Sequence, residues 1–138
     1  MLTINKGRTA RKENNMKTIA KYEELAKQKD KDKLTGISRD LYWGYFESKN
    51  AGADEINLNE IHRENEIEQI IKECHEYGIE RITISSTYSG ALTDVWEFVK
   101  RGCKVEGMKM VPLDSESYDY DAGKYVQRSK PALIIKIA

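Results

Sequence analysis

The sequence predicts an α/β domain built on a small mixed sheet of four strands, three parallel and the C-terminal one antiparallel, packed by helices and preceded by an αα-hairpin. The chain has 138 residues, enough for one core but too few for two. Its hydrophobic fraction of 39% supplies one small core and little more. From residue 54 onward, short β-branched segments alternate with amphipathic segments, the order typical of strands joined by crossover helices.

The first residues are expected to be a disordered tail. Residues 1–15 are polar and lack any periodicity, so they offer nothing to bury. Codons for residues 11–13 can contain a bacterial ribosome-binding sequence, and our hypothesis is that natural translation begins at Met16.

Residues 16–50 are expected to form a helical hairpin that packs on the rest of the chain. Residues 17–31 are helix-prone, and Ser38 can cap a second helix that ends at residues 50–52. This second helix places four apolar residues on one side and Trp43 on its flank. The four are Leu41, Tyr42, Tyr45 and Phe46.

Residues 51–138 are expected to form the α/β domain, with two helices at 63–77 and 89–101. Gly78 and Gly102 end these helices. Apolar residues spaced by three and four form one stripe on each helix. On the first helix they are Ile67, Ile70, Ile71, Cys74 and Tyr77, and on the second they are Leu92, Val95, Trp96 and Val99.

Four segments read as strands: 55–58, 81–86, 104–111 and 132–137. A long polar loop that begins after Pro112 joins the last two, and the last strand returns without a helix, so it should run antiparallel. The stripes and strands together predict the core: Ile67, Ile70, Ile71, Cys74, Ile82, Ile84, Leu92, Val95, Trp96, Val99, Val105, Ile134 and Ile137.

The net charge and the lack of long apolar segments make some classes of protein improbable. Lys and Arg number 23, as do Asp and Glu, and this zero net charge argues against a strongly basic nucleic-acid binder. The basic region from Lys17 to Lys33 could still contact nucleic acid, with a solvated helix as the alternative. No apolar run approaches the roughly 20 residues of a membrane span. We therefore expect a cytoplasmic protein with no membrane contact, in which Cys74 and Cys103 are small buried residues.

No motif in the sequence indicates catalysis, a metal or a cofactor. His62 and His75 are the only histidines, and neither they nor the two cysteines have the paired spacing of a metal site. No serine or cysteine lies in a recognisable nucleophile motif. The sequence therefore predicts no catalytic residues, no metal and no cofactor, and it favours a protein that is not an enzyme.

One candidate site is the turn between the strand at 81–86 and the next helix. Open α/β sheets bind ligands at this position, and the free N–H groups of a helix N-terminus favour anions. The hydroxyl residues there, which could hold a phosphate or a carboxylate, are Ser85, Ser86, Thr87 and Ser89. The alternative is ordinary helix capping, because no glycine-rich loop accompanies them.

The second candidate is the polar loop of residues 113–123, in which four carboxylates interleave with two tyrosines. Tyrosine supplies contact area at a low cost in entropy, and carboxylates can meet a surface rich in Arg and Lys. The pattern suits docking onto a basic protein surface, with a solvated loop as the alternative. The residues concerned are Asp114, Glu116, Tyr118, Asp119, Tyr120 and Asp121.

Residues 41–48, 77–90 and 96–109 resemble segments of small accessory proteins from phages, plasmids and conjugative elements of Firmicutes. The resemblance spans about residues 39–138 and implies no catalytic residues. It implies a mobile-element setting, in which small anti-defence proteins occur, including anti-CRISPR inhibitors of Cas nucleases.

Three functions remain open from the sequence. The favoured one is inhibition of a host defence protein, such as a Cas nuclease, through the acidic loop or the basic N-terminal region. The second is binding or conversion of a small anion at the turn from Ser85 to Ser89. The third is regulation through nucleic acid bound by the region from Lys17 to Lys33.

Overall fold

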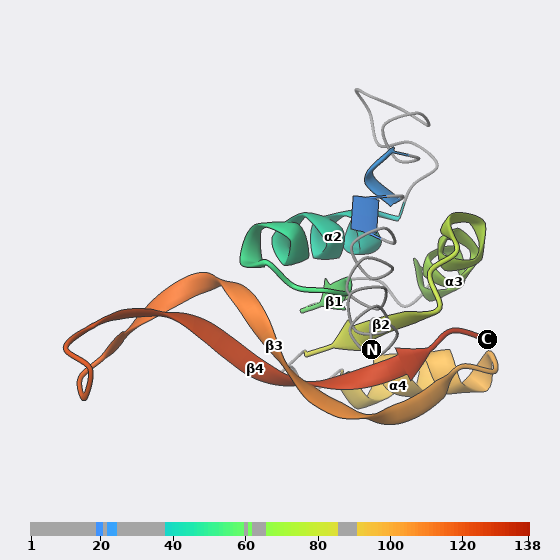
Figure 1. The fold of residues 1–138 in the computed structure, drawn as a ribbon. Helices are drawn as coiled ribbons and strands as arrows, with labels where there is room; N and C mark the ends of the chain where they lie inside the picture. The colour runs from blue at the N-terminus through green and yellow to red at the C-terminus, as the bar shows by residue number, and fades with distance from the viewer. Residues whose placement is uncertain (1–18, 21, 25–37, 60, 62–65, 86–90) are drawn as a thin grey trace, which may run out of the picture.

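The computed structural model describes the whole chain except residues 1–18, 21, 25–37, 60, 62–65 and 86–90 (Figure 1). The predicted tail, the start at Met16 and most of the first hairpin helix lie outside the described residues. Of that helix, Ile19 and Tyr22 are helical and buried, and the ring of Tyr22 lies 5.0 Å from the ring of Tyr45.

Helix α2 spans Arg39–Ala51 and begins and ends as capping chemistry predicts. The Ser38 hydroxyl accepts a hydrogen bond from the Leu41 amide, and Gly52 closes the helix in the left-handed conformation. Leu41 and Tyr45 are buried, as expected. Phe46 is 43% exposed, so its expected packing on the domain is wrong; Trp43, predicted on the flank, is 55% exposed.

Gly44 lets α2 lie directly against the sheet. A Cβ atom at this position would come within 2.8 Å of the Asn57 carbonyl oxygen and 2.9 Å of Leu58 Cδ2. The backbone of α2 therefore approaches strand β1, Asn57–Leu58, more closely than any side chain at this position would allow.

The sheet is mixed and four-stranded, but its order corrects the prediction. Strand β2 spans Arg81–Ile84 and pairs in parallel with β1. Strands β3 and β4 span Lys104–Asp119 and Lys124–Lys136. Strand β4 pairs antiparallel with β2 on one side and with β3 on the other. The order is β1-β2-β4-β3, so β1 and β2 are the only parallel pair among the described residues. A tight turn returns β4 directly along β3, and β4 also pairs with β2, so it separates β3 from β2.

The expected long polar loop is also wrong, because residues 113–119 and 124–131 belong to β3 and β4. The two strands pair from Lys104 and Lys136 out to Asp119 and Lys124, with irregularities between Val105 and Gly107 and between Pro112 and Glu116. Figure 1 shows the result: a long twisted ribbon that extends past the body of the molecule. We call its outer part, residues 113–128, the arm.

Helix α3 spans Glu66–Tyr77 and confirms the predicted apolar stripe. Ile67, Ile70, Cys74 and Tyr77 are each 0% exposed, and Ile71 packs against them while partly buried. The buried Glu73 carboxylate accepts a 2.7 Å hydrogen bond from the Ser38 amide, which ties α3 to the start of α2.

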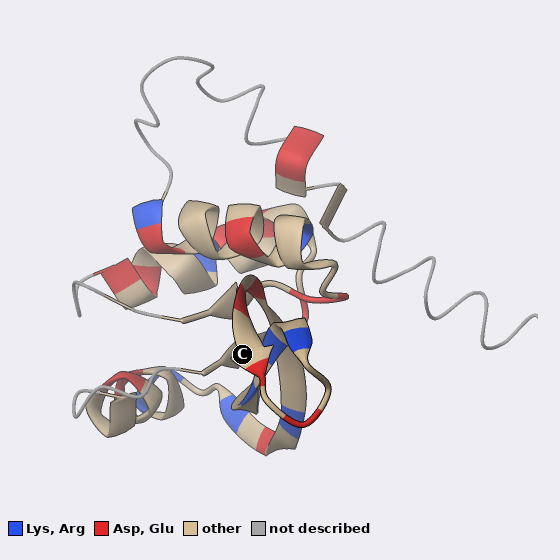
Figure 2. Ribbon diagram, turned by 90° about the vertical axis from the view of Figure 1, so that its left-hand side faces the viewer, with Lys and Arg blue, Asp and Glu red and all other residues tan. Residues whose placement is uncertain are grey.

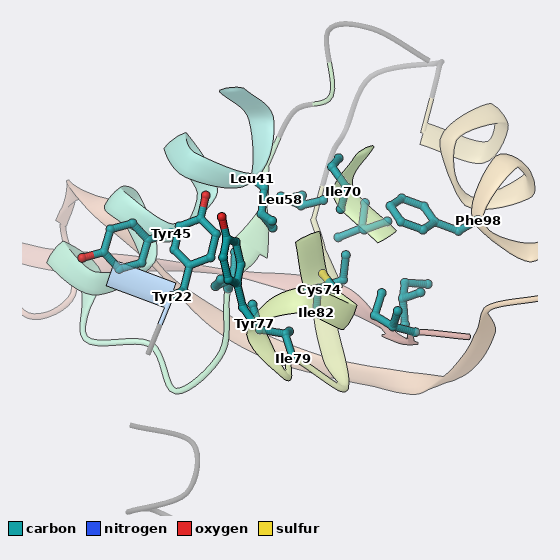
Figure 3. Packing of buried hydrophobic residues seen from close by; sticks show 14 of the residues in the cluster. Tyr22, Leu41, Tyr45, Leu58, Ile70, Cys74, Tyr77, Ile79, Ile82 and Phe98 are labelled. Carbon is teal, nitrogen blue, oxygen red and sulfur yellow. The ribbon is translucent and has the colours of Figure 1, made fainter. Parts of the chain in front are cut away.

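Helix α4, Ala91–Lys100, turns a different side to the core than the sequence predicts. Phe98 is 0% exposed and points toward Ile70 (Figure 3), and Val95 is partly buried. Three residues of the predicted stripe lie outside: Leu92 is 81% exposed, Trp96 58% and Val99 39%. The side of α4 with the most apolar residues is therefore exposed, and the side that carries Phe98 is buried.

The core lies between the helices and one face of the sheet. Ile82 and Ile84 are buried as predicted, Ile137 is 8% exposed and Ile134 is partly buried. Val105 is 44% exposed, and its neighbour across the ladder, Ile135, is buried instead. At the other end of the core, the rings of Tyr22, Tyr45 and Tyr77 lie next to one another (Figure 3). No described helix is both long and apolar enough to cross a membrane.

Candidate functional site: the arm and the pocket at its base

The outer part of the acidic, tyrosine-containing segment lies at the free end of the arm, which points toward the viewer in Figure 2, whereas Asp114 lies at the base of the arm. The last four residue pairs between β3 and β4 run from Glu116 and Gln127 to Asp119 and Lys124. We call residues 116–125 the tip. The structure thus places the predicted residues other than Asp114 close together, in a β-ribbon and its turn rather than in a loop.

Asp119 shapes the turn that ends the arm. Its side-chain Oδ1 accepts hydrogen bonds from the amides of Asp121, at 2.9 Å, and Ala122, at 3.1 Å. Gly123 completes the turn with a positive φ of 67° and donates its amide to the Asp119 carbonyl oxygen. Of the four predicted carboxylates, Asp119 therefore has a local structural task, while Asp114, Glu116 and Asp121 are exposed.

Three tyrosine rings cluster at the tip. The ring centroid of Tyr118 lies 4.9 Å from that of Tyr120 and 5.2 Å from that of Tyr125, both edge-on. Their exposed fractions are 43%, 88% and 67%. Tyr125 was missed by sequence reasoning, because its pairing with Tyr118 across the ladder depends on recognising the hairpin turn at residues 120–123.

Gln127 holds the base of the tip to the body. Its Nε2 donates a 2.8 Å hydrogen bond to the Ala51 carbonyl oxygen at the end of α2 and a 3.1 Å bond to the Leu113 carbonyl oxygen. The tip therefore projects from a fixed point rather than from a ribbon free along its whole length.

Ser85 follows the carboxyl end of β2 and is 4% exposed. Its hydroxyl accepts a 2.8 Å hydrogen bond from Asn57 Nδ2 and lies 3.3 Å from Asn59 Oδ1, to which it donates. Thr83 donates to Asn57 Oδ1 at 2.8 Å, and Lys130 donates to Asn59 Oδ1 at 3.2 Å. The Ser85 hydroxyl is thus engaged within the protein. Ser86, Thr87 and Ser89 lie outside the described residues.

A pocket of about 230 Å³ adjoins this hydrogen-bond network, between the end of α2, strand β1 and the base of the arm. Its lining is mostly polar and carries both signs of charge. The amide and charged residues are Glu47, Asn57, Asn59, Asp114, Arg128 and Lys130. One residue of each predicted site therefore lies near this pocket: Asp114 lines it, and Ser85 belongs to the hydrogen-bond network beside it.

Most of the pocket residues were not found from the sequence. Asn57 and Asn59 lie at the carboxyl end of a predicted strand, a position that could have marked them as candidates. Arg128 and Lys130 could not have been placed there, because they reach the pocket only through the pairing of β4 between β2 and β3.

Residues 40–137 match the model of a protein family described as a domain of unknown function, DUF7698. The chain belongs to the DUF7698 family. The matched DUF7698 region contains all four strands, the whole arm and every pocket residue named above. A comparison with curated proteins finds no match.

The cysteines of this DUF7698 protein are free, and Cys74 and Cys103 are both buried. Burial, the largest cause, raises the pKa of each thiol above its usual value, so both remain protonated near neutral pH. Within the part of the chain that the structure describes, no three His, Cys, Asp or Glu residues are grouped as metal ligands would be. His75 is exposed on α3, and His62 lies outside the described residues.

Proposed function

We propose that this DUF7698 protein acts by binding another protein and that the tip of the arm is its contact surface. The observation that carries the proposal is the exposed cluster of Tyr118, Tyr120 and Tyr125 at the end of an anchored ribbon. Aromatic rings held against one another lose little entropy on binding and provide large contact areas.

The exposed carboxylates beside the rings indicate the chemistry of the partner. Glu116 and Asp121 are exposed on the tip, where Lys124 is the one basic residue, so the surface beside the tyrosines is acidic. A basic protein surface, such as the nucleic-acid groove of a nuclease, complements it. Together with the resemblance to mobile-element accessory proteins, this supports inhibition of a host defence protein, specifically anti-CRISPR inhibition of a Cas nuclease.

The test compares baits that differ only at the tip. The wild-type chain, a Tyr118→Ala/Tyr120→Ala variant and a Trp43→Ala control are used to capture proteins from one host lysate. Trp43 is an exposed aromatic residue of α2 and lies outside the arm. A partner retained by wild type and control but lost with the tip variant, and whose nuclease activity falls when wild type is added, supports the proposal. A partner that the tip variant captures equally well contradicts it.

A second function, binding of a small anion, is favoured by the pocket at the base of the arm. Arg128 and Lys130 both line it beside buried amides and hydroxyls, and the carboxylates Glu47 and Asp114 line it as well, so an anion would be held by the two cations within a mixed-charge pocket. If it holds a phosphate or carboxylate ligand, that ligand raises the melting temperature of wild type but not of Arg128→Ala. Arg39→Ala, which removes an exposed arginine outside the pocket, is the control. No shift with nucleotides, sugar phosphates or small carboxylates contradicts this function.

The third function, binding of nucleic acid through Lys17 to Lys33, rests on residues that lie largely outside the described part of the chain. It stays a prediction from the sequence, which salt-dependent binding to DNA and RNA would test.

A further inference from the structure

Helix α4 carries an apolar surface that no described part of the chain covers. Leu92, Trp96 and Val99 are spaced by four and three residues, so they lie on one side of the helix. Their exposed fractions of 81%, 58% and 39% are those of surface residues, although two of them are large.

Strand β3 extends this surface. It contacts α4, and it is the edge strand of the sheet, so one of its sides has no neighbouring strand among the described residues. Met108 pairs with Leu133, which in turn pairs with the residue Ile84 of the core. Because cross-strand partners point to the same side of a sheet, Met108 and Met110 lie on the face that carries the core, beyond its edge. They are 65% and 60% exposed, and Val105 is 44% exposed.

We propose that two copies of this chain associate through this α4–β3 surface, with their β3 edges antiparallel about a two-fold axis. An antiparallel strand edge is complementary to itself, because rotation about such an axis brings each donor opposite an acceptor of the second copy. The available edge runs from Gly107 to Met110, between the irregularity at Val105 and the buried Val111.

The size of the surface favours a second copy as well. The largest apolar patch of a monomer is roughly 300–600 Å², and six side chains of this size and exposure reach that limit before the strand edge is counted. A standard interface buries roughly 800 Å² per partner. Of the charged residues on this part of β3, Glu106 pairs with Arg81 at 2.7 Å and Lys109 with Glu55 at 3.4 Å, so they add little repulsion between two copies. The surface lies at the opposite end of β3 from the tip, so the inference is independent of the proposed function.

The oligomeric state of the full chain tests the proposal. Sedimentation and light scattering should give a dimer for wild type, and Trp96→Glu and Met108→Lys should each raise its dissociation constant at least tenfold. Trp43→Glu is the matched control, because Trp43 has nearly the same exposure on another helix and should leave the dimer intact. Circular dichroism spectra that coincide with wild type show that the exposed substitutions leave the fold unchanged.

A crosslink tests the geometry separately. Cys74 and Cys103 are buried, so a short bismaleimide should not join two wild-type chains. It should join two chains of Met108→Cys, where the residue lies within reach of its counterpart in the second copy, and not of Trp43→Cys. A wild-type monomer at about 100 μM overturns the proposal, as does a dimer that survives both Trp96→Glu and Met108→Lys. If another part of the chain or a different protein covers the α4–β3 surface instead, the wild-type chain should be a monomer in this experiment.

Discussion

Phe98 and Trp96 stand two positions apart on α4 and have opposite surroundings. Phe98 is 0% exposed and Trp96 is 58% exposed. Hydrophobic spacing favours the wider stripe that contains Trp96, but the neighbours available to the helix decide which side is buried. Those neighbours, Ile70 among them, are supplied by α3 and the sheet, so no periodicity within α4 could have identified them.

Truncation of Phe98 should therefore be the costly change on α4. Phe98→Ala removes a completely buried ring and leaves a cavity, so we expect the free energy of unfolding to fall by about 3–5 kcal/mol. Chemical denaturation followed by circular dichroism measures it. Trp43→Ala removes an exposed aromatic residue and should cost less than about 1 kcal/mol. Equal losses for the two variants would show that the assignment of the buried ring is wrong.

At the scale of elements, α2 and α3 were predictable because local chemistry decides them. The cap at Ser38, the stop at Gly52 and the stripe of α3 depend on residues within one or two helical turns. The ribbon of β3 and β4 was not predictable in the same way. Most of its outer residues are exposed on both faces, so the alternation of apolar and polar residues that marks a half-buried strand is absent.

The candidate site follows the same division. The residues of the acidic segment were identified from composition alone, and all but Asp114 lie at the tip of the arm. Tyr125, Gln127 and Arg128 were missed because their contacts are made by strand pairing with residues that precede the turn, or by the approach of α2. Only a local signal, the Asp119 to Gly123 turn, could have suggested the ribbon.

The ion pair of Arg81 and Glu106 links β2 to β3 across β4, and it predicts a pH dependence. Arg81 Nε lies 2.7 Å from Glu106 Oε2, and this hydrogen bond is the largest cause that lowers the pKa of Glu106. A lowered pKa in the folded state stabilises the fold fully above the unfolded pKa of about 4.3 and loses this effect as the pH falls through the folded value.

Glu106→Gln should thus melt below wild type at neutral pH, and the difference should shrink progressively below about pH 4. The difference should also shrink in high salt, because both side chains are partly exposed. Melting curves from pH 3 to pH 7 measure it. Glu80→Gln is the control, since the 81% exposed Glu80 meets Arg81 only at 3.4 Å. A difference of the same size at pH 3 and pH 7 would contradict the assignment.

At the scale of the whole molecule, the two unexplained surfaces lie at opposite ends of β3. The tip is polar, acidic and aromatic, whereas the α4–β3 surface is apolar and has a free strand edge. Antiparallel association through the second surface would send the two arms in opposite directions, so each dimer would offer two separate tips. Both surfaces belong to the DUF7698 region, whose boundaries enclose all of β3 and β4.

Charge and aromatic area at the tip should affect different steps of binding. Charges at the edge of an interface mainly set the rate of encounter, whereas desolvated aromatic rings hold the complex together. Once the partner is purified, Glu116→Lys/Asp121→Lys should slow association and weaken its dependence on salt. Tyr118→Ala/Tyr120→Ala should instead speed dissociation at least tenfold, with association little changed. Asp119 is left in place because it forms the turn.

Surface plasmon resonance at two salt concentrations separates the rates, and Trp43→Ala should alter neither. Charge variants that bind with unchanged rates would exclude a basic partner surface, and tyrosine variants with unchanged dissociation would exclude the tip as the site of contact.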